Sequence, residues 1–222
     1  KSTHEDKKKY GNSAIVGYNI WQTYFFPVTS ENIMNDKEIS KIGEYYENDT
    51  EKSDELKKMR TFHNEIKSFL IKSHGEELGS KLKVLKILDI AIGAGGDILK
   101  YLDINIGSKK KIIVGIDKSK QNLDIAVERN QELSNQNKTK NAVIEYIQGD
   151  STKSFKNALA CDMEEDKERY RTHFAPKGMF DFITCHFAIH FFLETQKTWD
   201  GFLNNLEHAA KKGSYFTVTC LD

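Results

Sequence analysis

A glycine-rich turn between an apolar segment and a helix-like segment constrains this chain most. Residues 87–97 read Ile-Leu-Asp-Ile-Ala-Ile-Gly-Ala-Gly-Gly-Asp. The apolar first half is typical of a buried strand, and the glycines allow a tight turn into a helix. Such a turn brings backbone N–H groups close to a ligand at the carboxyl edge of a sheet. The dinucleotide fingerprint G-x-G-x-x-G is not met, because Ile98 occupies the place of its third glycine.

Strand-like and helix-like segments alternate along the chain. Apolar residues at helical spacing predict a helix over residues 54–72, with Ser53 or Asp54 as its cap. The expected strands are 84–91, 111–116, 143–148, 180–185 and 214–221, and the later helices are 97–102, 119–133 and 198–211. This order predicts an α/β fold with a mostly parallel, doubly wound sheet covered on both faces. The charged residues 152–178 are expected to form a surface insertion.

The length of 222 residues fits one α/β domain with an N-terminal extension. We assign residues 1–44 to a linker or extension and residues 45–222 to the domain. Because doubly wound sheets often continue past a fifth strand, we expect the C-terminal part of the domain to be missing.

The composition excludes several classes of protein. Lys+Arg and Asp+Glu number 33 each, so a broad nucleic-acid-binding surface is not expected, although local basic sites stay open. No apolar segment approaches the roughly 20 residues of a membrane span, and we expect no signal peptide. The three cysteines, Cys161, Cys185 and Cys220, lack CxxC spacing, which favours reduced thiols and a cytoplasmic setting.

Acidic residues at the ends of the expected strands point to a nucleoside. Asp117 ends the second strand, where a carboxylate accepts hydrogen bonds from a ribose diol; the alternative is an N-cap of the next helix. Asp150 and Ser151 end the third strand and suit an adenine, or else a capping turn. Asp89 and Asp97 flank the glycines, where a carboxylate orders the backbone or meets an α-ammonium group. The alternative for Asp97 is an acid at a helix N-terminus. A nucleoside joined to an amino acid, such as S-adenosylmethionine, satisfies the whole set.

The last expected strand before the C-terminal helix runs into an aromatic turn, residues 180–192. His186 and His190 are spaced like a metal pair, but no Glu follows His186 and no third ligand is signalled, so no metal is expected. A pocket for a flat base, edged by imidazole and ring faces, fits better. The alternative is a core of aromatic residues with satisfied histidines.

Three motifs in this order resemble the mRNA cap (guanine-N7) methyltransferases. They are residues 60–68 (Arg-Thr-Phe-His-Asn-Glu-Ile-Lys-Ser), 88–97 and 185–192, with Asp117 and Asp150 between them. The resemblance covers about residues 45–222. Residues 19–29 are similar to the linker preceding this domain in multifunctional capping enzymes of large cytoplasmic DNA viruses, of the African swine fever virus type.

The resemblance implies a Rossmann-like class I S-adenosylmethionine-dependent methyltransferase. Its expected activity is transfer of a methyl group from S-adenosyl-L-methionine to N7 of the guanine cap of mRNA. The implied partners are the capped 5′ end of mRNA and other domains of the same capping polypeptide, with no membrane. The implied location is the host cytoplasm and, for a viral protein, the virion.

The resemblance also implies which residues bind. The cofactor-binding positions are Lys67, Asp89, Ala91, Gly93, Gly95, Asp97, Asp117, Asp150, Ser151 and His186. Lys67 is expected on the methionine carboxylate, and His186 matches a usual glutamine near the methyl donor. The substrate-binding positions are Tyr45, His63, Asn64, Arg129, His190 and Phe191. Arg129 and His63 are expected near the cap phosphates; Tyr45, His190 and Phe191 match positions that contact guanine.

The chain departs from the family pattern at four places. Ala91 replaces a glycine, Ala94 a common lysine, Phe191 a tyrosine and His186 the glutamine. Guanine N7 carries a free lone pair in the ring plane, so we expect catalysis by positioning and no acid–base catalytic residue. Two alternatives stay open: a methyltransferase for a different acceptor, and a non-catalytic scaffold with the same fold, which Ala91 and Ala94 motivate. A nicotinamide dehydrogenase is disfavoured by the missing third glycine.

Overall fold

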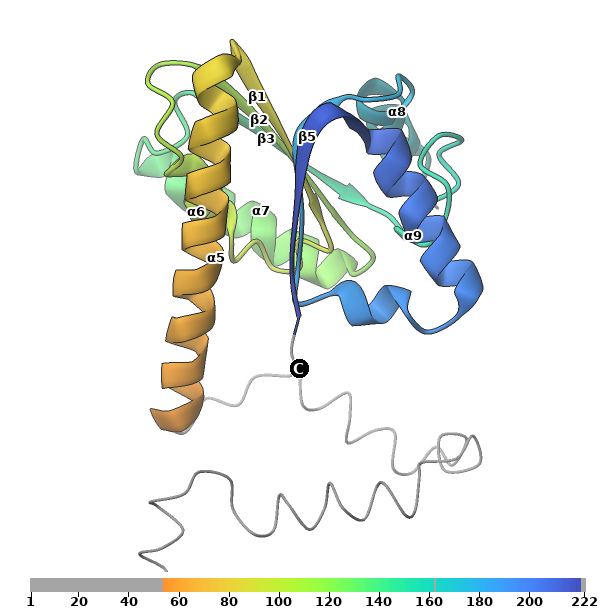
Figure 1. Ribbon diagram of the computed structural model, residues 1–222, viewed down its shortest axis with the longest axis horizontal. Helices are drawn as coiled ribbons and strands as arrows, with labels where there is room; N and C mark the ends of the chain where they lie inside the picture. Colours follow the sequence, from red (N-terminus) through yellow and green to blue (C-terminus); the bar gives the residue numbers. More distant parts are fainter. Residues whose placement is uncertain (1–53, 162, 221–222) are drawn as a thin grey trace, which may run out of the picture. The chain divides into compact units, whose positions relative to one another are not determined.

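The computed structural model describes residues 54–161 and 163–220 (Figure 1). In chain order the elements are α5 (Asp54–Lys81), β1 (Val84–Ile90), α6 (Ile98–Leu102), β2 (Lys110–Asp117), α7 (Lys120–Asn135), β3 (Ala142–Gln148), α8 (Glu164–Phe174), β4 (Phe180–His186), η1 (Ile189–Phe192), α9 (Gln196–Ala209) and β5 (Ala210–Thr219). The first four predicted strands are confirmed to within one residue at each end. The predicted boundary after residue 44 lies outside the described residues. Within the described ranges, no helix is long and apolar enough to cross a membrane.

The five strands form one parallel sheet in the order β3-β2-β1-β4-β5. From β1, the strands β2 and β3 follow in order toward one edge of the sheet. The chain then crosses over, and β4 and β5 lie on the other side of β1. This confirms the predicted doubly wound sheet. The order reverses between β1 and β4, and ligands of open α/β sheets bind outside the carboxyl ends of the strands at such a switch point.

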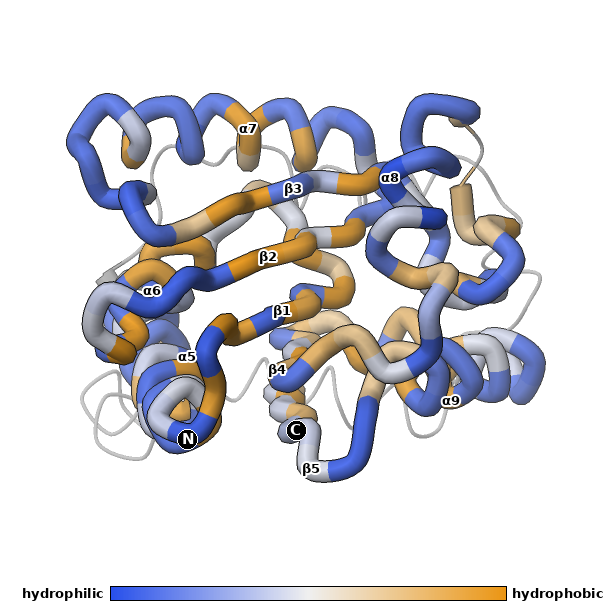
Figure 2. Tube along the Cα trace, turned by 90° about the horizontal axis from the view of Figure 1, so that it is seen from above, coloured by the Kyte–Doolittle hydropathy of each residue, from blue (hydrophilic) through white to orange (hydrophobic). Residues whose placement is uncertain are grey.

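Helices cover both faces of the sheet, as Figure 2 shows. Ile71 of α5 packs with Ile87 of β1 on one face. The next residue of β1, Leu88, packs on the opposite face with Tyr170 of α8 and Phe202 of α9. Successive side chains of a strand point to opposite faces of the sheet, so a largely apolar strand such as β1 is buried on both faces. The apolar strands therefore lie between two helical layers, α5, α6 and α7 on one side and α8 and α9 on the other.

The predicted surface insertion at residues 152–178 is wrong. This segment contains α8, which provides the crossover from β3 to β4 and packs into the core. Phe155, Tyr170 and Phe174 are almost completely buried, and the rings of Tyr170 and Phe174 stack with centres 4.6 Å apart. The apolar residues of α8 are few and are surrounded by charged ones on its exposed side, so the sequence conceals a half-buried helix.

Helix α5 is longer than predicted, because it continues past residue 72 to Lys81. Gly75 and Gly79 lie in this extension and do not end the helix. A Cβ at Gly75 would lie 2.5 Å from the Ile104 Cδ1 atom, and one at Gly79 would lie 2.1 Å from the Ile106 Cγ2 atom. The two glycines let α5 pack closely against the segment after α6. This close contact sets the position of α5 on the sheet.

Candidate functional site

The loop between β1 and α6 forms the predicted tight turn at the carboxyl edge. Ala91, Gly93 and Gly95 have φ of +61°, +56° and +71°, in the left-handed region that favours glycine. A Cβ at Gly95 would lie 2.6 Å from the Ile98 Cδ1 atom, so this glycine packs the loop against the molecule. At Gly93 a Cβ would meet no atom within 4 Å. The loop is therefore anchored at Gly95 and open beside Gly93.

Asp117, at the end of β2, ties this loop to the start of α7. Its Oδ2 atom accepts a hydrogen bond from the Gly93 N–H at 2.8 Å, and its Oδ1 atom accepts from the Ser119 N–H at 2.8 Å. The N-cap of α7 is Ser119, so the alternative of Asp117 as the cap is wrong. Because each carboxylate oxygen has a further lone pair, Asp117 can order the loop and still accept from a ligand.

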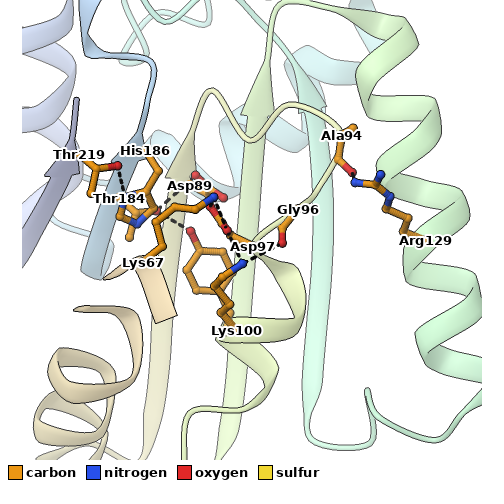
Figure 3. A network of polar contacts seen from close by, with 11 residues as sticks. Lys67, Asp89, Ala94, Gly96, Asp97, Lys100, Arg129, Thr184, His186 and Thr219 are labelled. Carbon is orange, nitrogen blue, oxygen red and sulfur yellow. Dashed lines mark hydrogen bonds and ion pairs between the residues drawn. The ribbon is translucent and has the colours of Figure 1, made fainter. Parts of the chain in front are cut away.

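Lys67 of α5 and Asp97 beside the loop form a partly buried ion pair (Figure 3). The Lys67 Nζ atom lies 2.8 Å from Asp97 Oδ1, and the Lys100 Nζ atom lies equally close to the same oxygen. Burial alone would raise the pKa of Asp97, but the charges and hydrogen bonds of Lys67 and Lys100 hold this pKa below its ordinary value. Asp97 is the N-cap residue of α6, yet its side chain makes no capping hydrogen bond.

Asp89 is buried at the end of β1. The Thr184 hydroxyl donates to its Oδ1 atom at 3.3 Å, and the Tyr101 hydroxyl lies 2.7 Å from the Thr184 hydroxyl. Burial and the charge of Asp97 raise the pKa of Asp89 to about 8. Asp89 is therefore mostly protonated at pH 7 and adds little negative charge beneath the loop.

His186, at the end of β4, is a neutral imidazole with one unused nitrogen. Its Nδ1 atom lies 3.1 Å from the Thr219 hydroxyl of β5. Its Nε2 atom is buried and finds no hydrogen-bond partner in the described part of the chain. Burial lowers the pKa of His186 to about 4, so the ring is uncharged at pH 7. A buried polar atom left without a partner is costly, and a ligand group would satisfy it.

Asp150 and Ser151 follow β3 in the predicted capping turn. The Asp150 Oδ1 atom accepts from the Thr152 N–H at 3.0 Å and from the Thr152 hydroxyl at 2.6 Å. Burial tends to raise the pKa of Asp150, but the Thr152 hydrogen bonds and the Lys118 charge lower this pKa overall. Ser151 is buried, and its carbonyl accepts from the Asn205 side chain at 2.8 Å. The turn thus leaves Asp150 charged at the edge of the sheet.

The predicted substrate positions are distributed more widely. The ring of His63 on α5 lies 4.7 Å from the ring of Phe187. Arg129 of α7 donates to the carbonyl of Ala94 at 2.6 Å, so it holds the glycine loop (Figure 3). Asn64 is exposed on α5. On η1, His190 lies beside Phe191 with ring centres 4.1 Å apart, and both residues are exposed. Tyr45 lies outside the described residues.

Sequence reasoning missed Phe187, which follows β4. Its φ of +55° is unusual for a bulky residue, and its N–H donates to the Thr219 carbonyl at 2.8 Å. The Lys67 ammonium lies 5.6 Å from the centre of its ring, within the range of a cation–π contact. Phe187 therefore connects His63 to the Lys67–Asp97 pair. A bulky residue directly after a buried strand was the available signal.

The site can be compared with known families now that its geometry is described. Residues 31–222 match the family model for the mRNA (guanine-N(7))-methyltransferase domain. The chain belongs to this family. The match includes every described element of the fold and all the predicted site residues.

One curated relative is named "Probable mRNA-capping enzyme" and comes from Acanthamoeba polyphaga mimivirus. It is 25% identical over 251 residues, and the alignment covers 100% of this chain but 20% of the relative, so this chain spans about a fifth of that protein.

Two solved structures are more distant. A SAM-dependent methyltransferase from Aquifex aeolicus is 21% identical, with a TM-score of 0.40 over 60% of this chain and 55% of its own. A SAM-dependent methyltransferase from Thiobacillus denitrificans, solved with S-adenosyl-L-homocysteine, is 16% identical, with a TM-score of 0.36 over 66% of this chain and 47% of its own. The fold assignment rests on the strand order of this chain itself.

Proposed function

We propose that this chain transfers a methyl group from S-adenosyl-L-methionine to N7 of the guanine cap of mRNA. Its membership of the guanine-N7 methyltransferase family supports the reaction. The observation that carries the proposal is the group of residues at the switch point. An ion pair, a strand-end carboxylate and an open glycine loop lie together there.

The residues at this edge fit the proposed cofactor. The methionine part carries a carboxylate and an ammonium, which Lys67 and Asp97 complement in charge. Asp117 would accept from the ribose, and Asp150 with Ser151 would meet the adenine. The open space beside Gly93 and the unpartnered Nε2 atom of His186 are the observations that favour a bound group. The hydrogen bonds of Arg129 and Asp117 hold the glycine loop in the conformation that would bind the cofactor.

The chain's own residues act by binding and orientation. When bound, S-adenosylmethionine supplies a methyl group on a sulfonium, which needs no further activation. Guanine N7 needs no deprotonation, so the site has to hold N7, carbon and sulfur in line, and such alignment supplies up to about 7–11 kcal/mol. The neutral ring of His186 adds no positive charge beside groups that carry one during transfer. We therefore assign no general base.

The substrate and partners belong to the same proposal. Five residues match positions that contact the cap in this family, and we propose that they contact the capped 5′ end of mRNA here. They are His63, Asn64, Arg129, His190 and Phe191. Because the mimivirus relative is much longer than this chain, we propose that the domain acts with further domains of a capping polypeptide. The host cytoplasm, where a cytoplasmic DNA virus makes its mRNA, is the proposed location.

The test is methylation of RNA that carries an unmethylated guanine cap, with labelled S-adenosylmethionine and the full chain. We expect N7-methylguanosine after digestion. The matched substrate carries 7-deazaguanine in the cap, which replaces the N7 lone pair by C–H and should accept no methyl group. Equal labelling of both caps, or labelling of another acceptor alone, would overturn the proposed function. If neither cap is labelled and no cofactor binds, the scaffold alternative holds.

A variant pair tests the cofactor site. Asp117→Ala removes a charged acceptor, and one such hydrogen bond contributes about 1.5–3 kcal/mol. Cofactor binding should therefore weaken roughly 10- to 100-fold for each bond lost. Asp124→Ala, on the exposed face of α7, is the control of equal charge and should bind normally. Thermal unfolding of both variants separates lost binding from a damaged loop, since Asp117 also accepts from the Gly93 N–H.

A further inference from the structure

Lysines gather at the opposite edge of the sheet, where the strands begin. Lys83 precedes β1, Lys110 and Lys111 begin β2, and Lys138 and Lys140 precede β3. The strand register pairs Val84 of β1 with Lys110, and Lys111 with Ala142 of β3, so these three strand starts are adjacent. We call Lys83, Lys110, Lys111, Lys138 and Lys140 the basal lysine cluster.

Stabilisation of helix ends accounts for only part of this charge. Helices of a parallel α/β fold end at the basal edge, and their last carbonyls attract cations. Lys111 donates from its Nζ atom to the Leu102 carbonyl at the end of α6. Lys109, outside the cluster, donates to the Gly79 carbonyl of α5 at 2.7 Å. Among the residues described, the side chains of the other four cluster lysines make no ion pair or hydrogen bond.

Three carboxylates near this edge have partners. Asp103 lies 3.4 Å from Lys72, and Glu77 lies 3.1 Å from Lys81 and accepts from the Tyr215 hydroxyl. Asp181, at the start of β4, pairs with Lys211. Among the described residues, no carboxylate makes an ion pair with a lysine of the basal lysine cluster, so the cluster presents positive charge at this edge.

A cavity of about 400 Å³ lies beside the cluster and is lined by three of its five lysines. It is bordered by the segment after α6, the start of β2 and the connection from α7 to β3. Its polar lining includes Lys111, Lys138, Lys140, Asn105, Asn137 and Asn141, together with one acid, Asp103, which pairs with Lys72. Ammonium and amide N–H groups are donors that phosphate oxygens accept. The cavity has no aromatic lining residue, so it offers no surface on which a base would stack.

We propose that the basal lysine cluster binds the sugar–phosphate backbone of single-stranded RNA, without base preference. A protein partner is less favoured by the composition, because protein interfaces are enriched in aromatic residues and depleted in lysine, whereas phosphate contacts use Lys, Asn and backbone N–H groups. That this RNA is the body of a capped transcript rests on the proposed function. The cluster lies at the edge opposite the glycine loop, so it is a second site and not part of the methyl-transfer site.

The test measures binding of a labelled, uncapped oligouridylate to the full chain by fluorescence anisotropy over a range of salt concentrations. Each phosphate neutralised on a single strand contributes about −0.7 to the slope of log K against log salt. The variant Lys110→Ala/Lys138→Ala/Lys140→Ala should bind more weakly, with a slope smaller in magnitude by about 2. The matched variant Lys156→Ala/Lys167→Ala/Lys197→Ala removes the same charge from the α8 and α9 side and should keep the original slope.

Methylation of a cap dinucleotide, which has no RNA body, keeps the two proposals separable. The cluster variant should methylate it at the normal rate, because none of its substitutions touches the glycine loop. An unchanged oligouridylate slope in the cluster variant, or an equal loss in both variants, would overturn the basal site while leaving the proposed function intact. Strong binding of an acidic peptide together with an unchanged RNA slope would assign the surface to a protein instead.

Discussion

Ala91 occupies a backbone conformation that glycine adopts more easily. With φ of +61° its Cβ crowds the following carbonyl, which costs roughly 1–2 kcal/mol for a residue with a side chain. Ala91→Gly removes this cost but adds about 0.4–1 kcal/mol of unfolded-chain entropy. We expect a net stabilisation of about 0.5–1 kcal/mol in denaturant unfolding. Ala175→Gly is the control: Ala175 is exposed with φ of −59°, so glycine there should only destabilise. Equal effects of the two substitutions would contradict the left-handed geometry.

Asp89 should make the stability of the protein fall as pH rises. Its pKa is about 8 in the folded protein and 3.8 ordinarily, so between these values the folded state holds a proton that the unfolded chain has released. The unfolding free energy should decrease through this window by up to about 1.4 kcal/mol per pH unit. Asp89→Asn keeps a neutral side chain, so its advantage over the parent should grow between pH 5 and pH 8. The comparison is denaturant unfolding of both proteins across this range, with Asp124→Asn as a surface control. A constant difference would mean that Asp89 is ionised when folded.

At the scale of elements, continuous apolar runs predicted the sheet. The features that the sequence did not predict depend on tertiary packing. β2, β3 and β4 are largely apolar segments that end at polar residues, and β1 runs into the glycine-rich turn, so their limits were readable. Helix α8 was missed because its buried side depends on two aromatic residues, Tyr170 and Phe174. The strand-end acids at the site were predicted from their spacing. Thr184 was not, because it contacts Asp89 from 95 residues away.

A pair of substitutions tests whether α8 belongs to the core. The Tyr170 hydroxyl is buried without a hydrogen-bond partner in the described ranges, and such a group costs about 1–3 kcal/mol. Tyr170→Phe should therefore stabilise the protein by about 1 kcal/mol or more. Phe174→Ala removes a ring packed against Tyr170 and should cost about 3–5 kcal/mol. Both effects are measured by denaturant unfolding. If neither substitution changes the free energy of unfolding, residues 152–178 do not belong to the core and form a surface insertion after all.

At the scale of the whole molecule, the two edges of the sheet should respond differently to ligands. S-adenosylhomocysteine at the switch point would contact the loop after β1 and the ends of β2, β3 and β4. A ligand at 100 times its dissociation constant stabilises the folded state by about 2.7 kcal/mol. Hydrogen–deuterium exchange should therefore slow at residues 91–97, 117–119, 149–151 and 186–188, beyond any global change. Oligouridylate should slow exchange at residues 105–111 and 137–141 instead, in the presence or absence of the nucleoside. Protection of the same edge by both ligands would mean that the chain has one binding surface, and the basal site would then be a part of the methyl-transfer site.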